Sequence, residues 1–230
     1  MIDPNAIRYN LESVKARIAD AAHRCGRKPE QITLCAVTKT QPIESVQIAV
    51  AEGLVNLGEN YYQELRDKWD AIPEEVHWHF IGGLQSNKTK YLVGRCATIQ
   101  SVDSLSLVKE INRRAESAGL VQSVLLEVQL GAGETRSGID KSSWQALFES
   151  TIDLKNVHVN GLMAVAPQTD DENEVRSAMR QMKSMFDMLP LENRNILSMG
   201  MTGDFEIAIE EGSNFLRIGS AIFGARASTL

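Results

Sequence analysis

The run Ile32-Thr33-Leu34-Cys35-Ala36-Val37-Thr38, followed directly by Lys39, decides how this sequence is interpreted. The run has the length and apolar content of a strand that is buried on both faces, as in a parallel sheet. A second run, Phe215-Leu216-Arg217-Ile218, leads into Gly219-Ser220 near the C-terminus. One strand therefore ends in an amine, and a distant strand ends in a glycine and a hydroxyl group.

Between these two runs, apolar stretches of strand length alternate with amphipathic stretches of helical length. The strand-length runs lie at 32–38, 54–57, 77–81, 97–101, 123–129, 157–165, 195–199 and 214–218. The amphipathic stretches lie near 42–53, 60–70, 86–94, 104–118, 141–152, 171–188 and 204–212. Eight strands that alternate with helices predict an α/β fold, a single (β/α)8 TIM-type barrel. An open, doubly wound sheet of fewer strands is the alternative.

An additional helix is predicted ahead of the first strand. Apolar residues recur there at spacings of three and four, at Ile7, Leu11, Val14, Ile18 and Ala22. The stretch Cys25-Gly26-Arg27-Lys28-Pro29 then ends the helical pattern. Because no linker divides the chain, we expect one domain over 1–230, with an N-terminal helix within 1–28 that packs on the barrel.

The composition argues against several classes of function. The 230 residues carry a net charge of −6 with no basic face, so we expect no nucleic-acid partner. No apolar run approaches the roughly 18–20 residues of a membrane span, and no signal-peptide pattern opens the chain. The three cysteines are far apart and form no C-x-x-C pair, which indicates reduced thiols in a cytoplasmic protein.

Lys39 is the candidate reactive residue. A lysine at the end of a buried strand loses hydration, so its amine deprotonates more easily and can attack a carbonyl carbon. The alternative is a lysine whose side chain simply extends to solvent.

The ends of the last two strands suit an anionic group. Met201-Thr202-Gly203 and Gly219-Ser220 follow these strands, where TIM barrels commonly bind phosphate. Glycines let backbone amides approach an anion, although ordinary turns also use them. A reactive amine beside a phosphate site indicates an aldehyde cofactor that carries a phosphate, pyridoxal 5'-phosphate (PLP).

Arg217 lies two residues before Gly219 on the same predicted strand. From there its guanidinium can point into the barrel mouth and donate a hydrogen bond to the pyridine nitrogen of PLP. Arginine stays protonated, so that nitrogen stays unprotonated. The ring is then a weaker electron sink than it is beside an aspartate, and low catalytic activity is expected.

A series of short segments runs through nearly the whole chain in an order typical of one family. The segments are Ala36-Val37-Thr38-Lys39-Thr40, Gly58-Glu59-Asn60-Tyr61, Gln63-Glu64, Trp78-His79-Phe80-Ile81-Gly82, Leu84-Gln85-Ser86-Asn87-Lys88, Ser137-Gly138-Ile139, Gly161-Leu162-Met163-Ala164, Leu197-Ser198-Met199-Gly200-Met201 and Arg217-Ile218-Gly219. Together they resemble the pyridoxal-phosphate homeostasis proteins (the YggS/PROSC family), which are similar to the N-terminal domain of alanine racemase.

The resemblance implies a set of cofactor contacts. PLP is expected as a Schiff base on Lys39, with Arg217 at the pyridine nitrogen and the phosphate in the last two loops. Thr202 stands where the family commonly has serine and Ser220 where threonine is frequent, and both keep a hydroxyl group. The expected cofactor-binding residues are Lys39, Asn60, Met201, Thr202, Arg217, Gly219 and Ser220.

The resemblance also implies a carrier rather than an enzyme. Racemases with this barrel use a second domain that supplies another acid/base residue, and we expect none here because the chain ends soon after the last strand. We expect cytoplasmic PLP (vitamin B6) homeostasis and supply, without catalytic turnover, by a monomer that serves PLP-dependent apoenzymes. The alternatives are a small PLP-dependent racemase or decarboxylase with weak activity, and a barrel enzyme whose Lys39 attacks a sugar or keto substrate without PLP.

Other polar residues are assigned no chemistry. His77 and His79 alternate about Trp78, but no third ligand is near in sequence, so no metal site is expected. Lys68 falls in a predicted helix and is not a candidate amine. Glu59 and Asp204 are candidate carboxylates near the barrel mouth, with no proton identified for either to move.

Overall fold

The structure is a computed structural model that describes residues 3–73, 75–131 and 137–224. Its strands are β1 (Thr33–Val37), β2 (Asn56–Glu59), β3 (His77–Phe80), β4 (Thr98–Val102), β5 (Gln122–Glu127), β6 (Val157–Met163), β7 (Ile196–Ser198) and β8 (Phe215–Ile218). Its α-helices are α1 (Pro4–Arg24), α2 (Ile43–Ala51), α3 (Tyr62–Trp69), α4 (Leu105–Ser117), α5 (Trp144–Glu149), α6 (Glu172–Asp187), α7 (Phe205–Glu210) and α8 (Ser220–Phe223). Short 3-10 helices are η1 (Pro29–Gln31), η2 (Ser86–Tyr91) and η3 (Leu191–Asn193).

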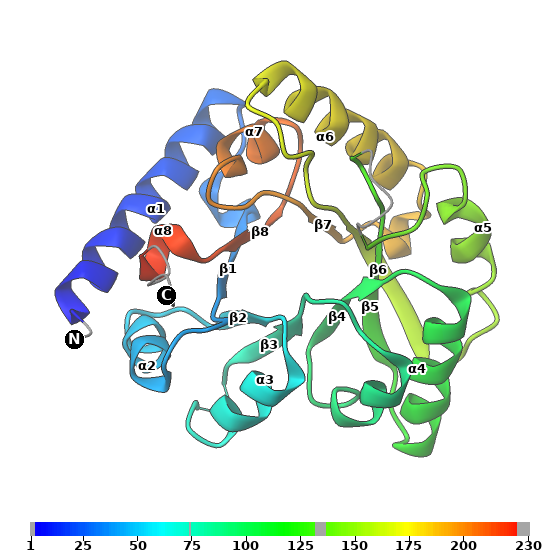
Figure 1. The fold of residues 1–230 in the computed structure, drawn as a ribbon. Helices are drawn as coiled ribbons and strands as arrows, with labels where there is room; N and C mark the ends of the chain where they lie inside the picture. Colours follow the sequence, from blue (N-terminus) through cyan, green and yellow to red (C-terminus); the bar gives the residue numbers. More distant parts are fainter. Residues whose placement is uncertain (1–2, 74, 132–136, 225–230) are drawn as a thin grey trace.

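The strands form one closed barrel in the order β1 to β8, and the helices surround it (Figure 1). Every neighbouring pair is parallel, including β1 and β8, which close the barrel from Thr33 opposite Phe215 to Ala36 opposite Ile218. This topology confirms the predicted (β/α)8 barrel and excludes the open sheet. Because all strands run in one direction, the residues that follow them meet at one end of the barrel.

The barrel core combines apolar packing with buried polar side chains. Leu57, Ile99 and Leu126 are fully buried, as expected for strands covered on both faces. Gln100 and Ser198 are also fully buried, although a polar side chain inside a core is costly unless it is hydrogen-bonded. These polar residues form part of the site described below.

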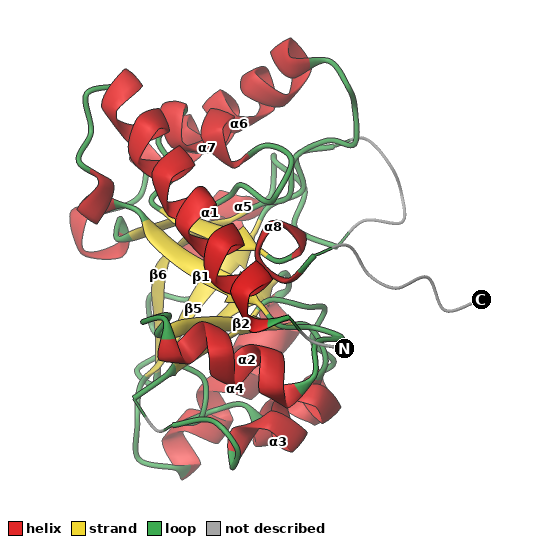
Figure 2. Ribbon diagram, turned by 90° about the vertical axis from the view of Figure 1, so that its left-hand side faces the viewer, coloured by secondary structure: helices red, strands yellow, loops and turns green. Residues whose placement is uncertain are grey.

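The additional helix α1 lies along the outside of the barrel, beside α8 and above α2 in Figure 2. Asp3 caps the helix by accepting a hydrogen bond from the amide of Asn5, and Pro4 occupies the first turn. The side chain of Asn10 donates to the carbonyl of Ile222, which ties α1 to α8. Within the described residues, no helix is both long and apolar enough to pass through a bilayer.

The amphipathic stretch predicted near 86–94 is a short 3-10 helix, η2, rather than an α-helix. The hydroxyl of Thr89 donates to the carbonyl of Ser86, an alternative to α-helical bonding that threonine offers readily. Gln85 occupies the N-cap position of η2, without a capping hydrogen bond from its side chain. Ser104 and Asp204 stand at the N-cap positions of α4 and α7, and neither side chain makes a capping hydrogen bond there.

Candidate functional site

A pocket of about 300 Å³ lies where β1 and β8 end. It brings together every predicted cofactor-binding residue except Asn60, although β1 and β8 lie at opposite ends of the sequence. The lining residues are Val37, Lys39, Thr40, Gln41, Met201, Thr202, Gly203, Arg217, Gly219, Ser220 and Gly224.

One side of this pocket is built from two hydroxyl groups and the start of α8. Ser220 donates to Oγ1 of Thr202 at 3.1 Å, and the amide of Ala221 donates to the same oxygen at 3.2 Å. A Cβ at Gly219 would lie 3.3 Å from both the side chain and the carbonyl oxygen of Val37, so only glycine fits without displacement. A short extra helix after the last strand is the usual phosphate site of TIM barrels.

Arg217 forms the floor of the pocket and is only 4% exposed. One terminal nitrogen donates to Oγ of Ser198 at 2.6 Å, and the other donates to the carbonyl of Ala164 at 2.8 Å. No group of the described residues accepts a hydrogen bond from its Nε–H. Burial lowers the pKa of Arg217, but the guanidinium still stays protonated.

Behind Arg217, a chain of polar side chains crosses the inside of the barrel from buried Ser198 to half-buried Asn56. Ser198 donates to Oε1 of Gln100 at 2.7 Å, and Nε2 of Gln100 lies 3.5 Å from Nδ1 of His79. Nε2 of His79 is 3.0 Å from Oδ1 of Asn56. Burial, assisted by nearby His77, lowers the pKa of His79 to about 3. His79 is therefore neutral, and the chain holds the guanidinium of Arg217 through Ser198.

Lys39 follows β1 in a tight turn that packs against α3. The amide of Gln41 donates to the carbonyl of Thr38 at 3.0 Å, so Lys39 and Thr40 are the two central residues of a β-turn. Lys68 of α3 is buried beside this turn, at 4% exposure, and pairs with Glu59. Sequence periodicity placed Lys68 in a helix correctly but gave no sign of its burial.

Asn60 lies outside the pocket lining, directly after β2. Its amide donates to Oε2 of Glu59 at 3.2 Å. Its Oδ1 is buried, and no hydrogen-bond donor reaches it from the described residues.

The cysteines and the histidine pair add no reactive group to the site. The three thiols are free, as the spacing indicated, and burial raises the pKa of both Cys35 and Cys96 to about 12. Cys35 is therefore a neutral thiol inside the barrel, despite the nearby guanidinium of Arg217. In the part of the chain that the structure describes, no group of three side chains could hold a metal ion.

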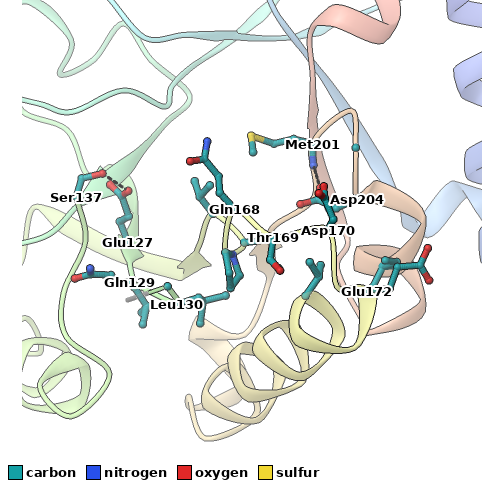
Figure 3. Close-up of a pocket in the computed structure, with 18 residues that line it drawn as sticks. Glu127, Gln129, Leu130, Ser137, Gln168, Thr169, Asp170, Glu172, Met201 and Asp204 are labelled. Atoms are coloured by element: carbon teal, nitrogen blue, oxygen red, sulfur yellow. Dashed lines mark hydrogen bonds between the residues drawn. The ribbon is translucent and has the colours of Figure 1, made fainter. Parts of the chain in front are cut away.

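A larger hollow of about 820 Å³ adjoins the pocket and shares Met201 and Gly203 with it (Figure 3). The loops after β5, β6 and β7 line this hollow with mixed polar and apolar side chains. Glu127 accepts a hydrogen bond from Ser137 at 2.6 Å, and Asp204 accepts one from the amide of Met201 at 2.6 Å. Burial raises the pKa of both carboxyl groups. The pocket thus opens onto a wide space rather than a closed chamber.

Comparisons with known proteins show the family to which this chain belongs. The family of the alanine racemase N-terminal domain matches residues 2–227. A pyridoxal phosphate homeostasis protein of Aquifex aeolicus is 41% identical over 220 residues, which is 94% of this chain and 96% of the relative. Its counterpart in Escherichia coli K12 is 37% identical over 229 residues, 96% of this chain and 97% of the relative. The chain belongs to the pyridoxal phosphate homeostasis protein family.

Solved structures with a similar fold include a member that binds PLP. PipY of Synechococcus elongatus, solved with PLP bound, has a TM-score of 0.77 at 30% identity and covers 90% of this chain and 100% of its own. The same protein without PLP has a TM-score of 0.82 and covers 91% of this chain and 99% of its own. Alanine racemase of Clostridium difficile shares the fold at 17% identity, with a TM-score of 0.75, over 98% of this chain and 58% of the racemase.

Proposed function

We propose that this chain holds PLP as a Schiff base on Lys39 and acts in cytoplasmic PLP homeostasis and supply, without catalytic turnover. The observation that carries the proposal is the convergence in one pocket of Lys39, Arg217 and the hydroxyl groups of Thr202 and Ser220. An amine, a fixed cation and hydroxyl donors are the groups that a phosphorylated pyridine aldehyde requires. The relatives' names and the PLP-bound PipY structure agree with this choice of ligand.

Different residues of the pocket are proposed to bind the aldehyde, the phosphate and the ring of PLP. Bound PLP would supply an electrophilic aldehyde carbon, and the Lys39 amine would hold the cofactor covalently by condensing with it and releasing the aldehyde oxygen as water. Gly219 and Ser220 present the start of α8 to the phosphate, with Thr202 beside them. Arg217 would hold the pyridine nitrogen by donating a hydrogen bond to it. Asn60, which follows β2 outside the pocket lining, would be a further polar contact on the cofactor side.

Two features favour supply over turnover. A protonated Arg217 at the ring nitrogen keeps that nitrogen unprotonated, which weakens the ring as an electron sink. The adjoining hollow leaves the cofactor side of the pocket open. An acceptor, such as the active-site lysine of a PLP-dependent apoenzyme, can approach from there. We further propose that the carrier is a monomer, which sedimentation equilibrium tests against the chain mass of 25.4 kDa.

Titration of purified apo-protein with PLP tests the binding proposal. The wild type is expected to develop the visible absorbance of a protonated imine, and Lys39→Ala is expected to show only free PLP. Lys183→Ala is the matched control, because Lys183 lies on outer helix α6 and pairs with Asp187 at an exposed site. Equal imine absorbance in the wild type and Lys39→Ala contradicts the assignment of Lys39. No imine in either protein contradicts PLP binding and favours a sugar or keto substrate.

Loss of α-deuterium from labelled amino acids tests the absence of turnover. The PLP-loaded protein is expected to exchange deuterium far more slowly than enzymes turn over, which is on the order of 1–10³ per second. Exchange within that range contradicts the carrier proposal and identifies a small racemase or another PLP enzyme.

A further inference from the structure

The turn that carries Lys39 contains an unfavourable backbone conformation. Thr40 has a φ of 61°, and it is the only residue other than glycine with a positive φ in the described parts of the chain. A β-branched residue rarely adopts this left-handed conformation, which turns of this kind normally give to glycine or asparagine. Such strain persists only where surrounding contacts hold it, and it concentrates at functional sites.

The contacts that hold the turn come from α3. The amide of Thr40 donates to Oε2 of Glu64 at 2.5 Å. On the other side of Lys39, the carbonyl of Thr38 accepts a hydrogen bond from Nζ of Lys68 at 2.6 Å. Glu64 and Lys68 are one helical turn apart, and Oε2 of Glu64 lies 3.1 Å from Nζ of Lys68. Side chains of α3 therefore hydrogen-bond to the backbone of the residues immediately before and immediately after Lys39.

A buried carboxylate completes this arrangement. Oε1 of Glu59 accepts from Nζ of Lys68 at 2.5 Å and from the hydroxyl of Thr38 at 2.7 Å. Lys68 thus has three acceptors for its three ammonium protons: Thr38, Glu59 and Glu64. Burying two charges costs desolvation free energy, and a well-packed apolar pair of similar volume often gives equal stability. Stability alone therefore does not account for placing an ion pair at this turn.

We propose that Glu59, Glu64 and Lys68 are positioning residues that hold Lys39 in the geometry needed to attack the aldehyde of PLP. This inference deepens the proposed function and rests on it. The three side chains do not line the PLP pocket, so they act through the backbone of residues 38–40. Loosening the turn is expected to slow imine formation while leaving the noncovalent binding of the ring and phosphate intact.

The test compares Glu64→Ala with Asp67→Ala, a control on the same helix. The side chain of Asp67 is 60% exposed and pairs with Arg66, not with the backbone of residues 38–40. Stopped-flow mixing with PLP measures the rate of imine formation, and calorimetry measures the affinity for pyridoxine 5'-phosphate, which lacks the aldehyde. Glu64→Ala is expected to slow imine formation about tenfold and to leave the affinity for pyridoxine 5'-phosphate unchanged. A tenfold change in rate corresponds to a free-energy difference within the range that one strained backbone conformation costs.

A second variant tests the link to backbone strain. Thr40→Gly removes the steric cost of positive φ, so it is expected to restore most of the rate when combined with Glu64→Ala. Equal rates for Glu64→Ala and Asp67→Ala overturn the inference. So does an equal loss of PLP and pyridoxine 5'-phosphate binding, or a double variant as slow as Glu64→Ala. If the wild type itself forms no imine, the proposed function has failed instead.

Discussion

At the scale of single residues, Arg217 joins the pocket to the barrel interior. Its two terminal nitrogens donate to Ser198 and Ala164, while the residue also lines the pocket. A lysine at this position keeps the charge but cannot form the same fork of hydrogen bonds. The role proposed for Arg217 thus depends on its shape as well as its charge.

Arg217→Lys is therefore expected to weaken PLP binding about tenfold or more, the loss typical of a hydrogen bond to a charged group. Arg27→Lys is a matched control, because Arg27 also donates to two carbonyls, those of Ile209 and Ser213, outside the pocket. Fluorescence titration with PLP measures both affinities. Equal affinities in the two variants would mean that Arg217 does not contact the cofactor.

His79 makes the stability of the fold depend on pH. Its pKa is near 6.5 in the unfolded chain and about 3 when buried, so below pH 6.5 only the unfolded state takes up the proton. Stability is thus retained above pH 6.5 and falls as the pH drops toward 3. From pH 7 to pH 5 the loss is about 2 kcal/mol. Urea unfolding of the wild type and His79→Gln measures this difference, and identical pH slopes would refute it.

At the scale of elements, α1 is a structural support for the phosphate side of the pocket. Its apolar stripe, which includes Leu11 and Val14, is buried, and the helix packs against α7 and α8. Arg17 reaches across to Glu206 at 2.5 Å and lies over the ring of Phe205. Because α8 carries Ser220, the position of α1 bears on the proposed phosphate contact.

Leu11→Ala is expected to lower the free energy of unfolding by about 2–5 kcal/mol, since it leaves a cavity under α1. Tyr9→Ala on the same helix, at a side chain that is 73% exposed, is expected to change it by less than about 0.5 kcal/mol. Chemical denaturation of the two variants provides the comparison. Similar losses for both would show that α1 does not depend on its buried stripe.

The sequence predicts an element well when the pattern that defines it lies within a short stretch of the chain. The strands and α1 follow from apolar periodicity, and the predicted bounds differ from the observed ones by only a few residues. The cofactor-binding residues found in the pocket were predictable because they lie within or shortly after β1, β7 or β8. The network of Glu59, Glu64 and Lys68 was not, because periodicity cannot show that a lysine on a short helix turns inward. The same holds for Gln100 and Ser198, whose partners lie on distant strands.

At the scale of the whole molecule, closure of the barrel brings the first and last strands together and so creates the pocket. To close the barrel, the backbones of neighbouring strands must approach each other closely, and at one such contact only glycine fits. Gly161 of β6 pairs with Ile196 of β7 at a φ of 145°, and a Cβ at this position would overlap the carbonyl of Ile196. The glycine is thus required by the seam between these two strands.

Gly161→Ala is expected to cost about 3 kcal/mol or more, because the overlap is with backbone and cannot be relieved by a rotamer change. Gly83→Ala is the control, since a Cβ there meets nothing within 4 Å. Thermal unfolding followed by circular dichroism separates the two variants. A melting temperature for Gly161→Ala as high as that of Gly83→Ala would contradict this reading of the seam.

The central claim is that Lys39 carries the cofactor, and peptide mapping after borohydride reduction tests it most directly. Reduction of the PLP-loaded protein fixes the cofactor on whichever amine holds it, and mass spectrometry identifies that lysine. We predict the phosphopyridoxyl group on the peptide that contains Lys39. Its presence instead on Lys68, the buried lysine beside the same turn, or on surface lysines without preference would contradict the account.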